Sequence, residues 1–181
     1  MAIYDASVLY PSLIRNLLMY LGTEGLVAAR WTATIHDEWT RNLLENRPDL
    51  TLERLTRTRQ RMTAALPDAE VEGFEPLTGT LSLPDLNDRH VLAAAIQAGA
   101  ELIVTQNLKH FPPQALTAHG IEALTPDALL GRLLDAEPVA TRAAVEKLRA
   151  SLRKPPYDMA QFLARLGAVG LVETAGRLGT K

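Results

Sequence analysis

The sequence predicts an α/β fold built on a small parallel sheet, with a helical extension at its C-terminal end. Through residue 134, short apolar runs typical of buried strands alternate with segments whose apolar residues recur at the helical period. Alternating strands and helices are joined by right-handed crossovers, which make the strands parallel. After residue 134 the helical period continues without strand-like runs. We therefore expect an α/β domain at 1–134 and a helical extension at 135–181.

The first half of the chain supplies three candidate strands and three candidate helices. In chain order we expect a strand at 2–4, a helix from Pro11 to Leu21, a strand at 26–31, a helix that Pro48 ends, a helix from Thr51 to Leu66, and a short strand at 69–72. Pro11 suits a first helical position, where no backbone N–H is needed. Gly22 is placed as the glycine that commonly follows the last turn of a helix.

The second half continues the alternation. In chain order we expect a helix that opens near Asp88 and ends at Gly99, a strand at 101–107, a short helix, a strand at 120–124, a helix capped by Thr125, and two helices at 138–154 and 158–178. The stretch ELIVTQN is almost uninterruptedly apolar at its start, as expected of a strand buried on both faces of a parallel sheet. Thr125 followed by Pro126 is a typical helix start.

Composition limits the classes of protein that this chain can belong to. The 181 residues include no cysteine, which excludes a disulfide framework, a thiolate nucleophile and cysteine-ligated zinc. The N-terminal stretch MAIYDASVLYPS lacks the basic and apolar segments of a secretory signal, and no run reaches the roughly 18 apolar residues of a membrane span. We expect a cytoplasmic protein.

The formal net charge of −2 hides an uneven distribution of charge. Residues 1–138 carry 11 Lys and Arg against 18 Asp and Glu, whereas residues 139–181 carry 8 against 3. Arg54, Arg57 and Arg61 recur at helical spacing, which suits either phosphate contacts with RNA or a solvated helix face. The tail adds five cations that suit RNA contacts or an interface: Arg142, Lys147, Arg149, Arg153 and Lys154.

Acidic and amide side chains gather where the predicted strands end or helices begin. They are Asp5 after the first strand, Glu38 early in a helix, Asp85, Asn87 and Asp88 ahead of the alanine-rich helix, and Asn107 after ELIVTQ. The carboxyl ends of parallel strands share one edge of the sheet, so these groups can converge there. Each alone is equally suited to a cap or a turn. Converging carboxylates need a cation, and hard oxygen ligands favour Mg²⁺ or Mn²⁺.

A magnesium or manganese ion at that edge would suit hydrolysis of a phosphodiester bond. Such an ion activates a bound water and offsets the charge that develops on phosphate oxygens. Competing classes fit less well: DASVL lacks the Asp-x-Asp-x-Thr pattern of haloacid-dehalogenase-type phosphatases, and no Gly-rich loop ends in Gly-Lys-Ser/Thr. A response-regulator receiver carries its phosphorylated aspartate after a middle strand, whereas Asp5 follows the first.

Four stretches together resemble the PIN-domain ribonucleases, a family that includes the toxins of VapBC-type toxin–antitoxin pairs. They are YDASVLYPS, ARWTATIHDEW, LPDLNDRHVLAAAIQAGAELIVTQNLKHFP and GIEALTPDALL, within residues 1–134. The resemblance implies a three-layer α/β/α sandwich, a Mg²⁺ or Mn²⁺ site and cleavage of single-stranded RNA. For a toxin it also implies an antitoxin partner and a homodimer.

Carried over position by position, the resemblance implies catalytic and metal-binding roles for Asp5, Glu38 and Asp88, with Asp85 as an accessory metal ligand. Five further residues fall at supporting or fourth-ligand positions: Ser7, Asn87, Thr105, Asn107 and His110.

Two of these positions depart from the family pattern, because His110 and Asn87 stand where acids are usual. A neutral imidazole binds Mn²⁺ better than Mg²⁺, so His110 can shift the metal preference or weaken the site. The alternative is a PIN-like module that binds RNA or protein without cutting. We expect His90 and His119 to be ordinary structural or surface residues, and His36 has no assigned role.

Overall fold

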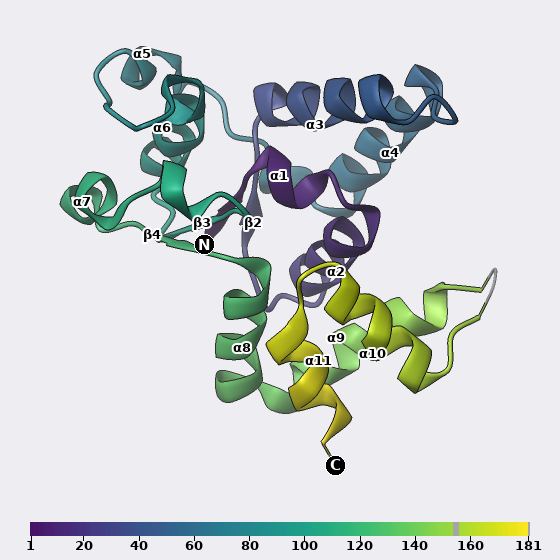
Figure 1. Ribbon diagram of the computed structural model, residues 1–181. Coiled ribbons are helices and arrows are strands. Elements are labelled where there is room, and N and C mark those ends of the chain that lie inside the picture. Colours follow the sequence, from purple (N-terminus) through teal and green to yellow (C-terminus); the bar gives the residue numbers. More distant parts are fainter. Residues whose placement is uncertain (154–155, 181) are drawn as a thin grey trace.

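A computed structural model describes residues 1–153 and 156–180, and it confirms the parallel α/β fold (Figure 1). Four strands form one sheet in the order β2-β1-β3-β4, and every neighbouring pair is parallel. Their bounds are β1 (Ala2–Tyr4), β2 (Ala29–Arg30), β3 (Leu102–Val104) and β4 (Glu122–Leu124). In the register of the two central strands, Tyr4 lies opposite Val104, so the residues that follow both strands emerge side by side.

Helices cover both sides of the sheet. The domain contains α1 (Ala6–Leu9), α2 (Ser12–Thr23), α3 (Ala33–Asn46), α4 (Leu52–Ala65), α5 (Glu75–Thr78), α6 (Arg89–Ala98), α7 (Pro113–Leu116) and α8 (Pro126–Ala136), with short 3₁₀ turns η1 (Pro67–Ala69), η2 (Leu86–Asp88), η3 (Leu108–His110) and η4 (Thr117–His119). Helix α6 packs on β1 and β3, whereas α2 contacts β2 and α8 contacts β4. The small side chains of 93–95 on α6 are fully buried, which allows close approach to the strands.

Local signals in the sequence set several helix ends. The side chains of Thr32, Thr51 and Thr125 each accept a hydrogen bond from the backbone N–H three residues later, at the starts of α3, α4 and α8. Gly99 ends α6 in the left-handed conformation, with φ of 63°, as expected of a helix-terminating glycine.

Three local predictions were wrong. Helix α2 begins at Ser12 with Pro11 as its N-cap, and it continues through Gly22 to Thr23. Gly22 lies in the last turn and does not terminate the helix. A Cβ at this position would approach Cδ1 of Leu66 to 2.7 Å, so the small residue permits close packing. The proposed strand at 69–72 is reduced to one bridge between Trp31 and Glu70, since β2 itself is only two residues long.

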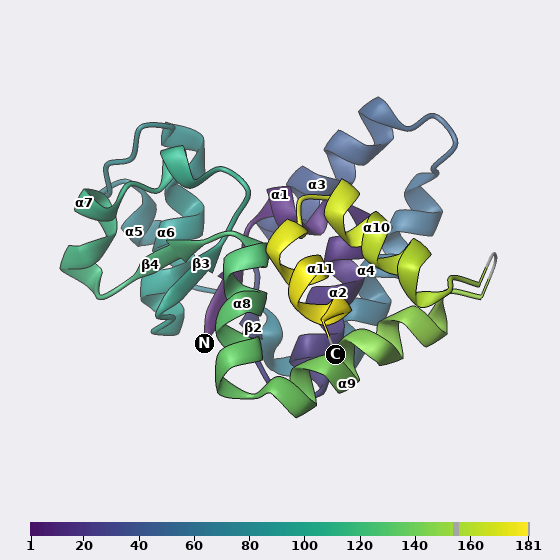
Figure 2. The same ribbon diagram turned by 60° about the horizontal axis from the view of Figure 1, so that its bottom comes forward.

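The C-terminal part contains three helices where the sequence predicted two. They are α9 (Pro138–Ser151), α10 (Met159–Ala168) and α11 (Val172–Gly179). The segment 158–178 is broken at Gly170, whose φ of +92° is incompatible with a continuous right-handed helix. Helix α9 lies against α2, and α11 packs on both α8 and α10 (Figure 2). Lys154, one of the predicted tail cations, lies outside the described residues.

The predicted division of the chain at residue 134 falls inside α8, which contacts β4 on one side and α9 and α11 on the other. The helical character of the C-terminal part is confirmed, and the division into two units stays a prediction. None of the helices in the described parts of the chain has the length and apolar character that crossing a bilayer requires.

Candidate metal centre at the strand ends

Asp5 is held at the end of the sheet by two hydroxyl groups. It directly follows β1, and its backbone N–H donates to the carbonyl oxygen of Val104 at 3.0 Å. Its Oδ2 accepts hydrogen bonds from Ser7 Oγ at 2.6 Å and from Thr105 Oγ1 at 2.7 Å. Because Thr105 follows β3, side chains from both central strand ends fix one carboxylate. Asp5 is only 4% exposed, so this orientation is maintained in a mostly dry environment.

Asp85, Asp88 and His110 form the densest group of ionisable side chains. Nδ1 of His110 donates to Asp88 Oδ2 at 2.6 Å and lies 3.8 Å from Asp85 Oδ2. One ligand atom from each of the three residues lies within 4.8 Å of the others, and all three side chains are partly exposed. The other oxygen of Asp85 caps η2 by accepting from the Asn87 N–H at 2.9 Å. One oxygen of Asp85 therefore caps η2, while its other oxygen faces the cluster.

The pKa of Asp88 is shifted by its burial and by the charged groups around it. Burial raises the pKa of the Asp88 carboxyl above its ordinary value, and the hydrogen bond from His110 opposes that rise. The negative charge of Asp5 raises the pKa further, as does that of Asp85 to a smaller degree. A carboxylate whose pKa is raised by neighbouring negative charges is stabilised in its ionised form by a bound cation.

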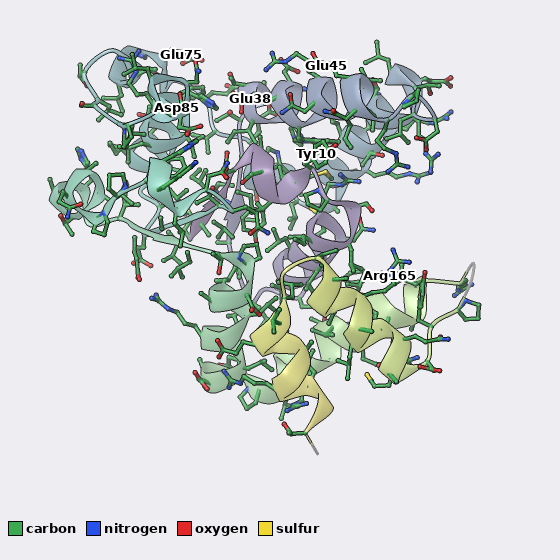
Figure 3. All side chains as sticks on the ribbon, viewed as in Figure 1. Tyr10, Glu38, Glu45, Glu75, Asp85 and Arg165 are labelled. Carbon is green, nitrogen blue, oxygen red and sulfur yellow. The ribbon has the colours of Figure 1, made fainter. Side chains whose placement is uncertain are left out.

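Glu38 contacts His90, a residue for which the sequence predicted no role in the site. Glu38 lies in the second turn of α3, and its Oε1 pairs with Nε2 of His90 at 2.9 Å. His90 is the second residue of α6, two positions after Asp88. Figure 3 labels Glu38 on α3 and Asp85 ahead of α6, the two elements that this pair connects. Glu38 and Asp5 both lie outside the cluster of Asp85, Asp88 and His110.

The contact of His90 with Glu38 was not predicted, and the expectation that His90 is an ordinary structural residue stays a prediction. One signal in the sequence was available: His90 opens the stretch HVLAAA, whose other members are all apolar and buried. A histidine on such a face needs a polar partner. Its Nδ1 is buried and has no hydrogen-bond partner among the described residues, so the contact with Glu38 is its one polar interaction there.

The remaining predicted supporting residues contribute less. The Asn107 side chain is exposed, while its backbone N–H donates to Thr105 Oγ1 at 3.0 Å. Asn87 is also exposed and contributes its backbone N–H to the Asp85 cap. His36 is buried beside Trp31 and Trp39, and it accepts a hydrogen bond from the Trp39 indole N–H. Burial lowers the pKa of His36 to about 4, so it is a neutral core residue.

The three arginines predicted to bind RNA do not surround the acidic group. Arg54, Arg57 and Arg61 are exposed on α4 and line a cleft of about 1060 Å³ between α2, α4 and α10. None of the acids described above lines that cleft. His119 ends η4 and is exposed.

A parallel α/β domain with polar side chains gathered near the ends of its central strands belongs to a class of folds that bind ligands at that edge. The model of the PIN domain family matches residues 2–109, which is more than half of the chain. The chain belongs to the PIN domain family. A second model, the VapC50 C-terminal domain, matches residues 126–180 and thus the helices from α8 to α11.

One curated relative is similar to part of the chain. It is the "Putative ribonuclease VapC50" of Mycobacterium tuberculosis, which is 46% identical over 80 residues. That stretch covers 44% of this chain and 47% of the relative, so the comparison spans about half of the relative's length. No solved structure matches the chain.

Proposed function

We propose that this protein is a metal-dependent endoribonuclease and the toxin of a toxin–antitoxin pair. The observation that carries the proposal is the cluster of Asp85, Asp88 and His110, whose ligand atoms lie within 4.8 Å of one another, in the same domain as the buried Asp5 carboxylate that follows β1. PIN family membership and the name of the relative support ribonuclease activity. Under this proposal the substrate is RNA, the partners are an antitoxin and a second copy of this chain, and the location is the cytoplasm.

The donor set at the strand ends fits Mg²⁺ or Mn²⁺. Asp5, Asp85, Asp88 and Glu38 offer carboxylate oxygens, and His110 offers an imidazole nitrogen beside two of them. Hard oxygen donors suit Mg²⁺, while an added imidazole favours Mn²⁺. When bound, such an ion supplies an activated water and stabilises negative charge on the phosphate oxygens.

The protein's own contribution is to hold the acids in place. Ser7 and Thr105 donate to the same oxygen of Asp5, which leaves Oδ1 available to a ligand. His90 fixes Glu38 at the beginning of α3, and His110 fixes one oxygen of Asp88. Hydroxyl and imidazole partners orient each carboxylate before substrate arrives, which reduces the reorganisation that binding requires.

The test is cleavage of single-stranded RNA by the full chain with added Mg²⁺ or Mn²⁺. Wild type should cut, and chelation, Asp5→Asn and Asp88→Asn should each reduce the rate by at least about 100-fold. Asp68→Asn is the matched control, because that aspartate is exposed on η1 and should leave the rate unchanged.

The second candidate is a PIN-like module that binds RNA or protein without cutting it. His110 and Asn87, which replace usual acids, are the observations that favour it. Intact RNA with either metal, together with retained oligonucleotide binding, would establish this alternative and exclude the nuclease.

A further inference from the structure

A large cleft of the described chain lies away from the acidic cluster and is strongly cationic. It has a volume of about 1060 Å³ and lies between α2, α4 and α10, with the C-terminal end of α3 at its edge. Its arginines are Arg15, Arg47, Arg54, Arg57, Arg61 and Arg165. No aspartate or glutamate of the described chain lines it. We call this feature the arginine cleft.

Several of these guanidinium groups are available to an anionic ligand. Arg54 and Arg61 are exposed, and no carboxylate among the described residues lies within ion-pair distance of them. Arg165 is also exposed and has no carboxylate partner there, but it donates a hydrogen bond to the Tyr157 hydroxyl and stacks over the Tyr157 ring at 4.9 Å. Arg57 pairs with Glu53 at 2.8 Å, but both side chains are more than half exposed. Exposed pairs of this kind contribute little stability, so the guanidinium can exchange its partner for a phosphate.

Arg15 has a structural role in the wall of the cleft. Arg15 is buried, donates to the carbonyl oxygen of Leu9 at 2.6 Å and stacks over the ring of Trp39 at 4.8 Å. Burial lowers its pKa to about 10, which leaves it cationic at neutral pH. It therefore adds positive potential to the cleft wall without being free to move.

The cleft also offers aromatic and apolar surface. Leu55 and Met62 are buried on the inner side of α4, and Tyr10 and Tyr20 are partly exposed in the lining. Exposed arginines beside partly exposed aromatic rings are typical of surfaces that bind single-stranded nucleic acid, where phosphates pair with cations and bases stack on rings.

The position of the cleft connects it with the acidic group. Tyr10 is the C-cap of α1, and Asp5 is the N-cap of that same helix. A rise of about 1.5 Å per residue places the two within roughly 8 Å along the chain axis. In Figure 3, Tyr10 is labelled beside α1, and Arg165 is labelled on α10 on the far side of the cleft.

We propose that the arginine cleft binds the backbone of single-stranded RNA beyond the phosphodiester that is cut, and that Arg165 of α10 is part of this surface. The proposal rests on the proposed ribonuclease function and extends it. It gives the C-terminal helices a role in substrate binding, because α10 contributes one cationic wall while α4 contributes the other. An acidic peptide is the competing occupant, and the partly exposed tyrosines favour RNA over it.

The experiment measures binding separately from cleavage. A labelled single-stranded RNA of about 12 nucleotides, within the range that single-strand grooves cover, is titrated with the full chain in a chelator. Arg54→Ala with Arg61→Ala, and separately Arg165→Ala, should each raise Kd by about threefold or more. Each removed phosphate contact should reduce the slope of log K against log salt by about 0.7. Arg61→Lys should retain most of that slope because it keeps the charge.

The matched control is Arg132→Ala on α8, an exposed arginine that is paired with Glu122 outside the cleft. Its RNA affinity should equal that of wild type, and thermal unfolding should be the same for all these surface variants. Cleft variants whose RNA affinity and salt dependence equal those of wild type would overturn the inference. The same holds if these variants lose binding to a protein partner but keep their RNA affinity.

The two proposals fail separately. Arginine-dependent binding without RNA cleavage would exclude the nuclease and leave the cleft assignment standing. Cleavage that is equally efficient in wild type and cleft variants on long and short RNA would overturn the cleft assignment and leave the nuclease standing.

Discussion

Replacing Thr105 with valine tests whether the buried hydroxyl groups hold Asp5 in its working position. Thr105 is fully buried, and its Oγ1 donates to Asp5 Oδ2 at 2.7 Å. Valine has nearly the same shape, so the change removes the hydrogen bond to Asp5 and the one accepted from the Asn107 N–H without leaving a large cavity. A hydrogen bond to a charged group contributes about 1.5–3 kcal/mol. Ser7 still donates to the same oxygen, so we expect the lower part of that range, about 2 kcal/mol.

For a chain of this size, a loss of about 2 kcal/mol lowers the melting temperature by roughly 4–8 °C. The free energy of unfolding can be measured by urea titration with the fluorescence of Trp31 and Trp39, which are both buried. The RNA cleavage rate should fall further than stability alone explains, by about tenfold or more, because a displaced Asp5 misplaces the metal. Thr105→Ser keeps the hydroxyl and should retain most of the activity. If Thr105→Val were as stable and as active as wild type, the hydroxyls would have no role in positioning Asp5.

Three further changes address the other acids. His110→Asp should raise the affinity for Mg²⁺ relative to Mn²⁺, because it replaces an imidazole with a hard oxygen donor. Calorimetric titration with each ion measures the ratio of the two affinities. An unchanged ratio would show that His110 is not a metal ligand. Burial raises the pKa of Asp88 above its ordinary value of 3.8, so the metal-free fold is favoured below that value and loses stability as pH rises through the folded-state pKa. Asp88→Asn should therefore stabilise the metal-free protein at pH 7 and lose this advantage near pH 3. Thermal unfolding of variant and wild type across this pH range measures the effect. A stability difference between the two proteins that is the same at both pH values would contradict the assigned burial. His90→Phe should release Glu38 and reduce the RNA cleavage rate by about tenfold. His90→Gln can still donate a hydrogen bond to Glu38, so its cleavage rate should fall less. Equal cleavage rates for the two variants would refute a positioning role of His90.

The order of strands and helices could be predicted because it depends on local periodicity and caps. Thr51 and Thr125 cap helices where the sequence placed those caps, and Gly99 ends α6. The break at Gly170 was missed because glycines are common in the surrounding segment, and only tertiary packing decides which one leaves the helical conformation. Gly22 was misassigned for a related reason: its small size serves contact with Leu66, which is distant in sequence.

The candidate site was predictable only in part. Asp5 and Asp88 could be assigned because each directly follows or precedes an element that the sequence defines. The pair of Glu38 and His90 could not, because it joins α3 to α6 across 52 residues, and no local pattern reports such a contact. The sequence pointed to the arginines of α4 but not to Arg165, which lines the same cleft only because of how the C-terminal helices pack.

The partners of the acids separate a binding site from an ordinary charged surface. Asp37 and Glu38 are adjacent on α3, yet Asp37 pairs with Arg59 at 2.6 Å, whereas Glu38 pairs with a histidine. Asp5, Asp85 and Asp88 also have only hydroxyl, imidazole or backbone partners, and no lysine or arginine of the described chain pairs with them. A surface acid paired with a guanidinium is already compensated. Acids held in place by groups that orient them without a permanent positive charge remain able to attract one from solution, and a divalent cation meets that requirement.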